Sequence, residues 1–427
     1  MKLCATRSTL PPVIRLASLA VVLGLVTAST ANATSTPSAA SSSVVPQQEA
    51  PASADPSHAA AIRKLVTDTM ASEHLRAVIV RATVNGKEML TQAFGESMTG
   101  VPATTDMHFR NGAVAISYIS TLLLQLVDQG TVSLDDKVSK WLPSLPHANE
   151  VTLGQLAQMT SGYADYALGN PAFAEQLLSD PFQQWAPDEL LQFAHVDQPL
   201  LYEPGTNWDY AHTNYVILGL ALEKITGKPL ARALQKDVLR PLGLANTANQ
   251  ETPAIPDPAL HAFSSERRSF LGISDGTPFY EESTFWNSSW FVRGAIETTN
   301  IKDLHRTAIA VGTGELLSRK SYKKMISTDL RGTGSPLPGC ATCGLQTEQY
   351  AYGLGIVTTG NWVMQNPLFS GESAAFAYLP SEKVAIAVVV TYAQEAFGPD
   401  GGYSNQADAL WRQIGALLAP GDQPPPQ

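Results

Sequence analysis

The sequence FRNGAVAI, residues Phe109–Ile116, begins a segment that is apolar at helical spacing and predicts a buried helix. The pattern continues through Ile119, Leu122, Leu123, Leu126 and Val127. Residues three apart on a helix share one face, so Ala113 and Ile116 are expected to lie together. Alanine has no oxygen and isoleucine has no amine, so neither side chain can act as a nucleophile or accept a proton.

Segments before this helix predict the start of a sheet. Residues Ala59–Ser72 have helical spacing, and Val78–Val84 and Glu88–Phe94 suit strands. The dipeptide Asn85-Gly86 between the two strands is a strong signal for a two-residue hairpin turn. The chain therefore opens with a helix and an antiparallel hairpin.

The rest of the chain predicts helices first and strands later. Residues 113–244 read as mostly helical, including a helix over Tyr215–Ile225 that ends at Gly227. The expected later elements are strands at Tyr352–Thr358, Ser373–Tyr378 and Val384–Tyr392 and a last helix at Gln406–Leu418. Strands at both ends with helices between them indicate an α+β domain whose sheet joins the chain ends, beside an all-helical lobe.

Composition supports a globular protein and argues against some partners. The 427 residues are 44% hydrophobic and 15% charged, which suits a large core. The net charge is −10. Without the first 33 residues, 25 basic and 38 acidic residues remain, a net charge of −13. This balance disfavours nucleic acid and anionic membrane surfaces as partners.

The N-terminus is typical of a secretory signal. Basic residues precede an apolar run at Leu16–Val26, and cleavage is expected after Ala33. The run is too short to span a bilayer comfortably, although an uncleaved anchor is the alternative. We expect an exported protein, periplasmic or extracellular, with a signal peptide at 1–33. A Ser/Ala/Pro-rich linker at 34–58, a domain at 59–419 and a frayed tail at 420–427 are expected to follow.

Two cysteines remain after signal removal, Cys340 and Cys343. Export favours a local disulfide between them, with free thiols as the alternative. A zinc site would need two more ligands, and the sequence offers none at suitable spacing. No metal or cofactor site is predicted.

The stretch Phe109–Ile116 resembles the F-R-x-G-S-x-x-K segment of the serine β-lactamase, penicillin-binding-protein and class C esterase superfamily. Further resembling stretches follow in the same order, at Ser133–Pro143, Leu153–Tyr166, Glu203–Gly205, Tyr210–Gly219, Gly294-Ala295, Asp303-Leu304 and Gly360–Pro380. The resemblance covers residues 60–418. It implies an α+β, β-lactamase/transpeptidase-like fold, with the sheet formed from both chain ends.

In that superfamily a serine attacks a carbonyl, and a lysine and the tyrosine of a Y-x-N segment move its proton. Ala113 and Ile116 stand at the serine and lysine positions, and Tyr210-Ala211-His212 stands at Y-x-N. Without the lysine, the pKa of Tyr210 is expected to stay near 10, which makes the phenol a poor base. Tyr210 and His212 are each interpreted as hydrogen-bonded pocket residues, with ligand contact as the alternative for Tyr210 and titration near neutral pH for His212.

A third superfamily segment, K-T-G or H-x-G, supplies a basic group and an oxyanion donor. Spacing from Trp362 places Gln365, Asn366 and Pro367 there. Glutamine is uncharged, and proline has no backbone N–H. A rival alignment uses Phe369–Gly371, which also lacks a basic residue.

Three other serines are candidates for a replacement nucleophile. Ser321 begins a literal S-x-x-K, and Ser117 lies one turn beyond Ala113, but neither has the expected context. A pair between Ser161 and His212 stays open. Residues expected to line the cleft, with core packing as the alternative for the aromatic ones, are Glu372, Ser373, Phe279, Tyr280, Phe285, Trp286, Trp290 and Phe291.

The first hypothesis is therefore an inactive pseudoenzyme that acts as a binding or interaction module, with cell-wall peptides, β-lactams and small amides or esters as candidate ligands. The second is an active enzyme with a rewired site, such as an esterase, D-alanyl-D-alanine carboxypeptidase or β-lactamase. The third is a scaffold for a protein partner.

Overall fold

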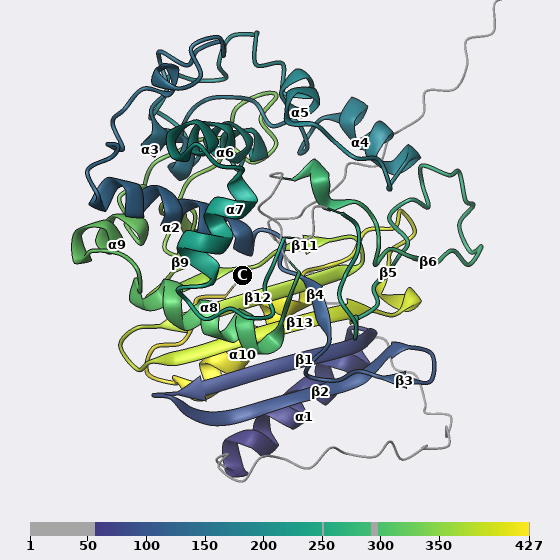
Figure 1. Ribbon diagram of the computed structural model, residues 1–427. Helices are drawn as coiled ribbons and strands as arrows, with labels where there is room; N and C mark the ends of the chain where they lie inside the picture. The colour runs from purple at the N-terminus through teal and green to yellow at the C-terminus, as the bar shows by residue number, and fades with distance from the viewer. Residues whose placement is uncertain (1–55, 250–251, 292–297, 427) are drawn as a thin grey trace, which may run out of the picture.

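Strands from both ends of the chain meet at the centre of one antiparallel sheet. In the computed structural model, which describes residues 56–249, 252–291 and 298–426, β1 (Leu75–Val84) pairs with β13 (Val384–Tyr392) and places Val80 opposite Val388. The strand order is β3-β2-β1-β13-β12-β10-β9-β8, with β11 paired to β12 (Figure 1). This architecture confirms the predicted α+β fold and its sheet built from both chain ends.

The described part of the chain has three sheets. The other strands of the large sheet are β2 (Lys87–Met98), β3 (Val101–Pro102), β8 (Ala351–Tyr352), β9 (Val357–Thr359), β10 (Trp362–Gln365), β11 (Leu368–Phe369) and β12 (Glu372–Leu379). The two small sheets pair β4 (His108–Arg110) with β7 (Thr298–Asn300), and β5 (Phe263–Ser264) with β6 (Glu281–Glu282).

Helices cover the sheet and build the second lobe. The helices are α1 (Pro56–Ser72), α2 (Val114–Asp128), α3 (Leu153–Gln158), α4 (Pro171–Ser179), α5 (Pro187–Phe193), α6 (His212–Thr226), α7 (Leu230–Leu234), α8 (Ile301–Thr313), α9 (Arg319–Met325) and α10 (Gln406–Leu418). Helices α1 and α10 pack together and on the sheet, α8 also packs on the sheet, and α2 packs against α6, α7 and α9 (Figure 1). Every residue of β12 and β13 is buried, as expected for strands covered by helices.

Local sequence signals account for several element boundaries. Asn85 and Gly86 both have positive φ, 48° and 77°, as a type I′ hairpin turn requires. Gly227 ends α6 in the left-handed conformation, with φ 66°. Thr152 caps α3 through its side chain and forms a capping box with Gln155. The sequence predicted the turn at Asn85-Gly86 and the helix end at Gly227, because each residue type satisfies one backbone requirement.

Three expectations about the elements differ from the structure. The strand expected at Tyr352–Thr358 is two strands, because the chain turns between Tyr352 and Val357 at Gly353 and Gly355. The middle of the chain is less helical than predicted, because its helices are joined by long loops. Helix α1 begins at Pro56, inside the segment read as linker. Most of that linker and the signal segment lie outside the described residues.

The end of the chain is also better ordered than the predicted frayed tail. The Trp362 Nε1 donates to the carbonyl of Asp422 at 2.8 Å, and Arg412 Nη1 donates to that of Pro425 at 2.8 Å. Pro424 is buried. Residues 421–426 therefore pack against β10 and α10, because the prolines cover an apolar surface there.

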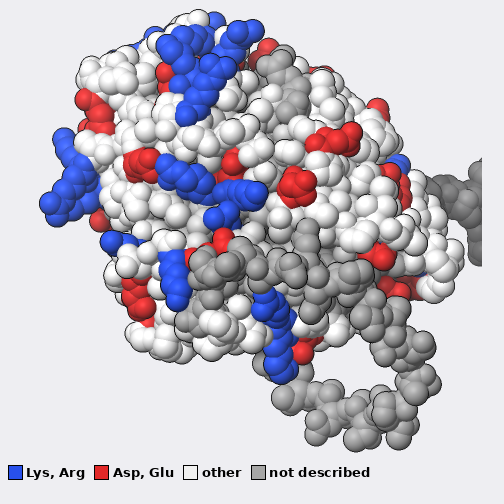
Figure 2. All heavy atoms as spheres, turned by 60° about the horizontal axis from the view of Figure 1, so that its bottom comes forward, with Lys and Arg blue, Asp and Glu red and all other residues white. Residues whose placement is uncertain are grey.

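The described surface gives two further observations. No described helix has both the length and the hydropathy needed to cross a bilayer. On the face in Figure 2, lysines and arginines form several separate groups with acidic side chains between them.

Candidate functional site

The Phe109–Ile116 segment and the segment around Gln365–Pro367 meet at the start of α2. Strand β4 leads through Asn111 and Gly112 into α2, and Gly112 has a φ of 50°. A Cβ on Gly112 would lie 2.5 Å from Pro367 Cβ and 2.6 Å from Phe369 Cε1. Only glycine lets the two segments approach this closely. The structure thus brings the Ala113 region and the 365–371 region together, as their predicted roles require.

The side chains at 113 and 116 have different environments. Ala113 is partly exposed at the N-terminus of α2. Ile116 is 0% exposed and belongs to the hydrophobic core. A methyl group therefore occupies the nucleophile position, and an aliphatic side chain packs where the lysine would be.

Tyr210 is almost fully buried just before α6. Its backbone N–H donates to Thr342 Oγ1 at 2.8 Å. Burial raises its pKa well above 10, and the negative potential of Tyr350 and Asp165 adds to the shift. The expected pKa near 10 is therefore wrong, because it considered only the missing lysine and not desolvation. The phenol is an even weaker base at neutral pH than the sequence indicated.

His212 is held by a carboxylate that the sequence analysis did not single out. The Asp165 Oδ2 accepts a hydrogen bond from His212 Nδ1 at 2.9 Å, and Oδ1 accepts one from the His212 backbone N–H at 2.9 Å. Both side chains are buried. Aromatic rings surround the imidazole, with centroids 5.1 to 5.9 Å away, from Tyr166, Tyr210, Trp290 and Phe291. The interpretation of His212 as a hydrogen-bonded pocket residue matches this geometry.

The hydroxyls proposed as replacement nucleophiles are engaged elsewhere. Ser161 Oγ donates to Asn214 Oδ1 at 2.5 Å, so the Ser161–His212 pair left open by the sequence is not formed. Ser117 Oγ donates to the carbonyl of Val114. Ser321 Oγ donates to Asp128 at the far end of α2.

One hydroxyl–imidazole pair occurs elsewhere in the described residues. Thr83 Oγ1 lies 3.0 Å from His305 Nε2, between β1 and α8. Both residues are buried away from the cleft, and burial lowers the pKa of His305 to about 3. This pair is a core contact.

The third segment is occupied with structural hydrogen bonds. Gln365 is 2% exposed, and its Nε2 donates to the carbonyl of Gly355 at 2.9 Å. The Asn366 carbonyl accepts from Asn405 Nδ2 at 2.7 Å. Pro367 offers no N–H, and its carbonyl accepts from Ala374 N at 3.0 Å. The Gln365–Pro367 stretch thus carries no charged side chain, its glutamine amide is engaged, and its proline has no N–H.

Residues expected to line the cleft divide into two groups. Glu372, Trp286 and Trp290 line a narrow cavity with Arg110, whose free space of about 10 Å³ holds about one water molecule. Burial raises the pKa of Glu372 to about 8, although Arg110 opposes the shift. Of the others, Phe291 packs against His212, whereas Ser373 bonds Tyr392, Tyr280 stacks on Phe263 and Phe285 lies beside His261. Gly294-Ala295, another resembling stretch, lies outside the described residues.

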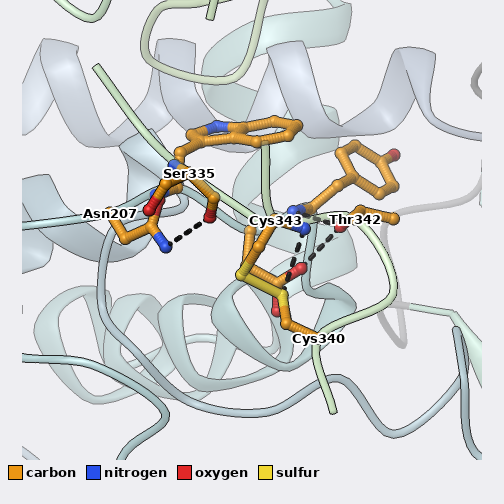
Figure 3. The surroundings of a disulfide bond; sticks show 8 residues. Asn207, Ser335, Cys340, Thr342 and Cys343 are labelled. Atoms are coloured by element: carbon orange, nitrogen blue, oxygen red, sulfur yellow. Dashed lines mark hydrogen bonds between the residues drawn. A yellow bond between two sulfur atoms is a disulfide. The ribbon is translucent and has the colours of Figure 1, made fainter. Parts of the chain in front are cut away.

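The disulfide loop contacts the segment that contains Asp209 and Tyr210. Cys340 and Cys343 are bonded, and Thr342 between them donates to Asp209 Oδ1 at 2.5 Å while accepting from the Tyr210 N–H (Figure 3). Two hydrogen bonds join Asn207 to the backbone of Ser335, which precedes the disulfide loop. The sulfurs lie within 4.8 Å of an Asp209 carboxylate oxygen. Metal binding needs thiolates, and the bonded sulfurs are not thiolates.

Comparison with known proteins places this geometry in context. The β-lactamase family model matches residues 62–410. Penicillin-binding protein 4 of Amycolatopsis lactamdurans is 33% identical over 174 residues, 38% of this chain and 40% of that protein. Esterase EstB of Burkholderia gladioli is 31% identical over 179 residues, 39% of this chain and 45% of that protein. The match thus spans less than half the length of each of these two relatives.

Solved structures share the fold. The D-amino acid amidase from Ochrobactrum anthropi SV3, complexed with D-phenylalanine, aligns with a TM-score of 0.68 and 21% identity. The alignment covers 86% of this chain and 100% of the amidase chain. At this identity the likeness establishes the fold alone.

Proposed function

Because this chain belongs to the β-lactamase family, we propose that it is a catalytically inactive member that serves as a binding or interaction module. The observation that carries this proposal is the pair Ala113 and Ile116, a methyl group at the nucleophile position and a core residue at the lysine position. Loss of a nucleophile alone costs on the order of 10⁶-fold in rate, roughly 8 kcal/mol of barrier.

The other two segments support the same proposal. Tyr210 has a pKa raised by burial and is not a base at neutral pH. Gln365 is uncharged and donates to Gly355. An enzyme with a rewired site is less well supported, because Ser161 is bonded to Asn214 and not to His212. The nucleophile and lysine positions are thus replaced, while the fold around them is that of the family.

The ligand class in this proposal is small and amino-acid-derived. The amidase relative carries D-phenylalanine in its solved structure, and a penicillin-binding protein is among the relatives. We therefore expect cell-wall peptides, β-lactams or small amides and esters as ligands, with a protein partner as the alternative. Export remains our expectation from the N-terminal segment, and the disulfide supports it.

The test combines covalent labelling with binding. The purified chain is incubated with a fluorescent penicillin and with a fluorophosphonate, and its intact mass is measured. The proposal predicts an unmodified mass together with a raised melting temperature in the presence of a D-alanyl-D-alanine peptide or a penicillin. A stoichiometric adduct on the wild-type chain would refute inactivity. If no ligand of these classes shifts the melting temperature and no partner is recovered from the exported fraction, the binding role is wrong.

A further inference from the structure

A second cavity lies behind the Asp165–His212 pair. Its volume is about 360 Å³, near the lower end for small-molecule sites. The walls come from the loop after α3, the loop after α5 and the disulfide loop at Gly339, Cys340 and Ala341. Neither Ala113 nor Tyr210 is part of the wall, and no residue lines both this cavity and the narrow cavity at Arg110.

Two carboxylates and one imidazole, that of His195, belong to the residues that line this cavity. Asp165 and Asp209 both line the cavity, and none of its lining residues is lysine or arginine. The Asp165 carboxylate already accepts three hydrogen bonds, two from His212 and one from the Leu168 N–H at 2.8 Å. The uncompensated carboxylate is therefore that of Asp209.

Asp209 is 3% exposed, and only one of its two carboxylate oxygens accepts a hydrogen bond from the described residues. Its Oδ1 accepts from Thr342, while no hydrogen bond or ion pair reaches Oδ2 from any described residue. Burial raises its pKa to about 7, as expected for a carboxyl group without a paired cation. Asp209 lines the cavity, so a ligand that enters it can donate a hydrogen bond to the carboxylate oxygen that Thr342 leaves free.

One part of the wall is apolar, while Tyr163, Asn170 and Gln198 add polar groups elsewhere. Leu168, Phe193, Val196, Leu200 and Leu201 line the same cavity. A hard divalent cation would need six or more oxygen ligands, which one free carboxylate oxygen beside a disulfide does not provide. An ammonium group needs one carboxylate and a few acceptors, and its carbon chain matches the apolar side.

We infer that this cavity binds a small primary amine with an apolar side chain, anchored by the Asp209 carboxylate. The ligand is of amino-acid to dipeptide size, and its hydrocarbon part packs between Phe193 and Leu200. The inference does not depend on the cleft at Ala113 being inactive, because the two sites share no catalytic residue.

The test is calorimetric titration of the full chain with 2-phenylethylamine and with its neutral analogue 2-phenylethanol. The amine is expected to bind at least tenfold more tightly than the alcohol. Asp209→Asn keeps the Oδ1 acceptor for Thr342 and is expected to weaken amine binding at least tenfold. The matched control Asp197→Asn removes an exposed acid that does not line the cavity, and should change affinity less than twofold.

A second variant separates binding from folding. Ala341 is exposed at the cavity wall, so Ala341→Phe adds bulk without disturbing the core and should also weaken amine binding. Equal affinities for the amine and the alcohol would overturn the inference. So would the absence of amine binding when the protein is at millimolar concentration and the amine is in 10-fold excess. Calcium binding that Asp209→Asn abolishes, without amine binding, would overturn it in favour of a cation site.

Discussion

Replacing Ile116 by lysine tests whether position 116 can still accommodate a charged amine or is now part of the hydrophobic core. Ile116 is 0% exposed and packed within the hydrophobic core. A lysine there must be neutral in the folded state, and removing its proton at pH 7 from a reference pKa near 10.4 costs about 5 kcal/mol. That is a large share of the 5–15 kcal/mol that typically stabilises a domain. Ile116→Met, which nearly conserves volume, should cost less than about 1.5 kcal/mol.

The free energy of unfolding of Ile116→Lys should also depend on pH. The folded-state pKa of the new lysine is depressed, so the unfolded state binds more protons and stability rises with pH. Between pH 7 and pH 9 the penalty of Ile116→Lys should shrink by about 3 kcal/mol relative to Ile116→Met, at about 1.4 kcal/mol per pH unit. Urea unfolding followed by circular dichroism at both pH values measures it. A penalty below about 1 kcal/mol with no dependence on pH would show that an amine is accommodated there and would refute the reasoning.

Three further outcomes are expected. Gly355→Ala should lower the free energy of unfolding in urea by about 3 kcal/mol or more, because its Cβ would lie 2.2 Å from Ser120 Oγ. The control Gly86→Ala has a similar φ but lies in open space, and should lower it by about 1 kcal/mol. Equal losses of stability would contradict the close packing at Gly355. Replacing both Cys340 and Cys343 by serine should cost about 2 kcal/mol, and reductant should then lower the melting temperature of the wild type only. Burial raises the pKa of Glu372 to about 8, so the folded state keeps a proton that the unfolded state has lost, and stability should fall by about 2 kcal/mol from pH 6 to pH 8. Glu372→Gln should remove that part of the pH dependence, and an unchanged profile would show that Glu372 is ionised in the fold.

The framework was largely readable from the sequence. The last strand at Val384–Tyr392 and the last helix at Gln406–Leu418 have the bounds that were predicted, since valine runs and helical periodicity are local signals. Loss of chemistry at Ala113 and Ile116 was equally readable, because it depends on residue type alone.

The environment of each pocket residue could not be predicted in the same way. Asp165 was missed because nothing in the spacing along the chain shows that its carboxylate reaches His212, 47 positions later. The pKa of Tyr210 was misjudged because burial comes from residues distant in sequence. The cavity at Asp209 depends on three loops that only the fold brings together. Periodicity indicates elements, whereas a site depends on distances between elements.

The most direct measurement is hydrolysis of p-nitrophenyl butyrate by the wild-type chain beside His212→Ala and Tyr210→Phe. All three proteins are expected to give the rate of buffer alone, because position 113 carries no nucleophile and Ser161 is bonded to Asn214 and not to His212. Brisk wild-type turnover that is lost in His212→Ala would contradict it and reveal a working, rewired enzyme.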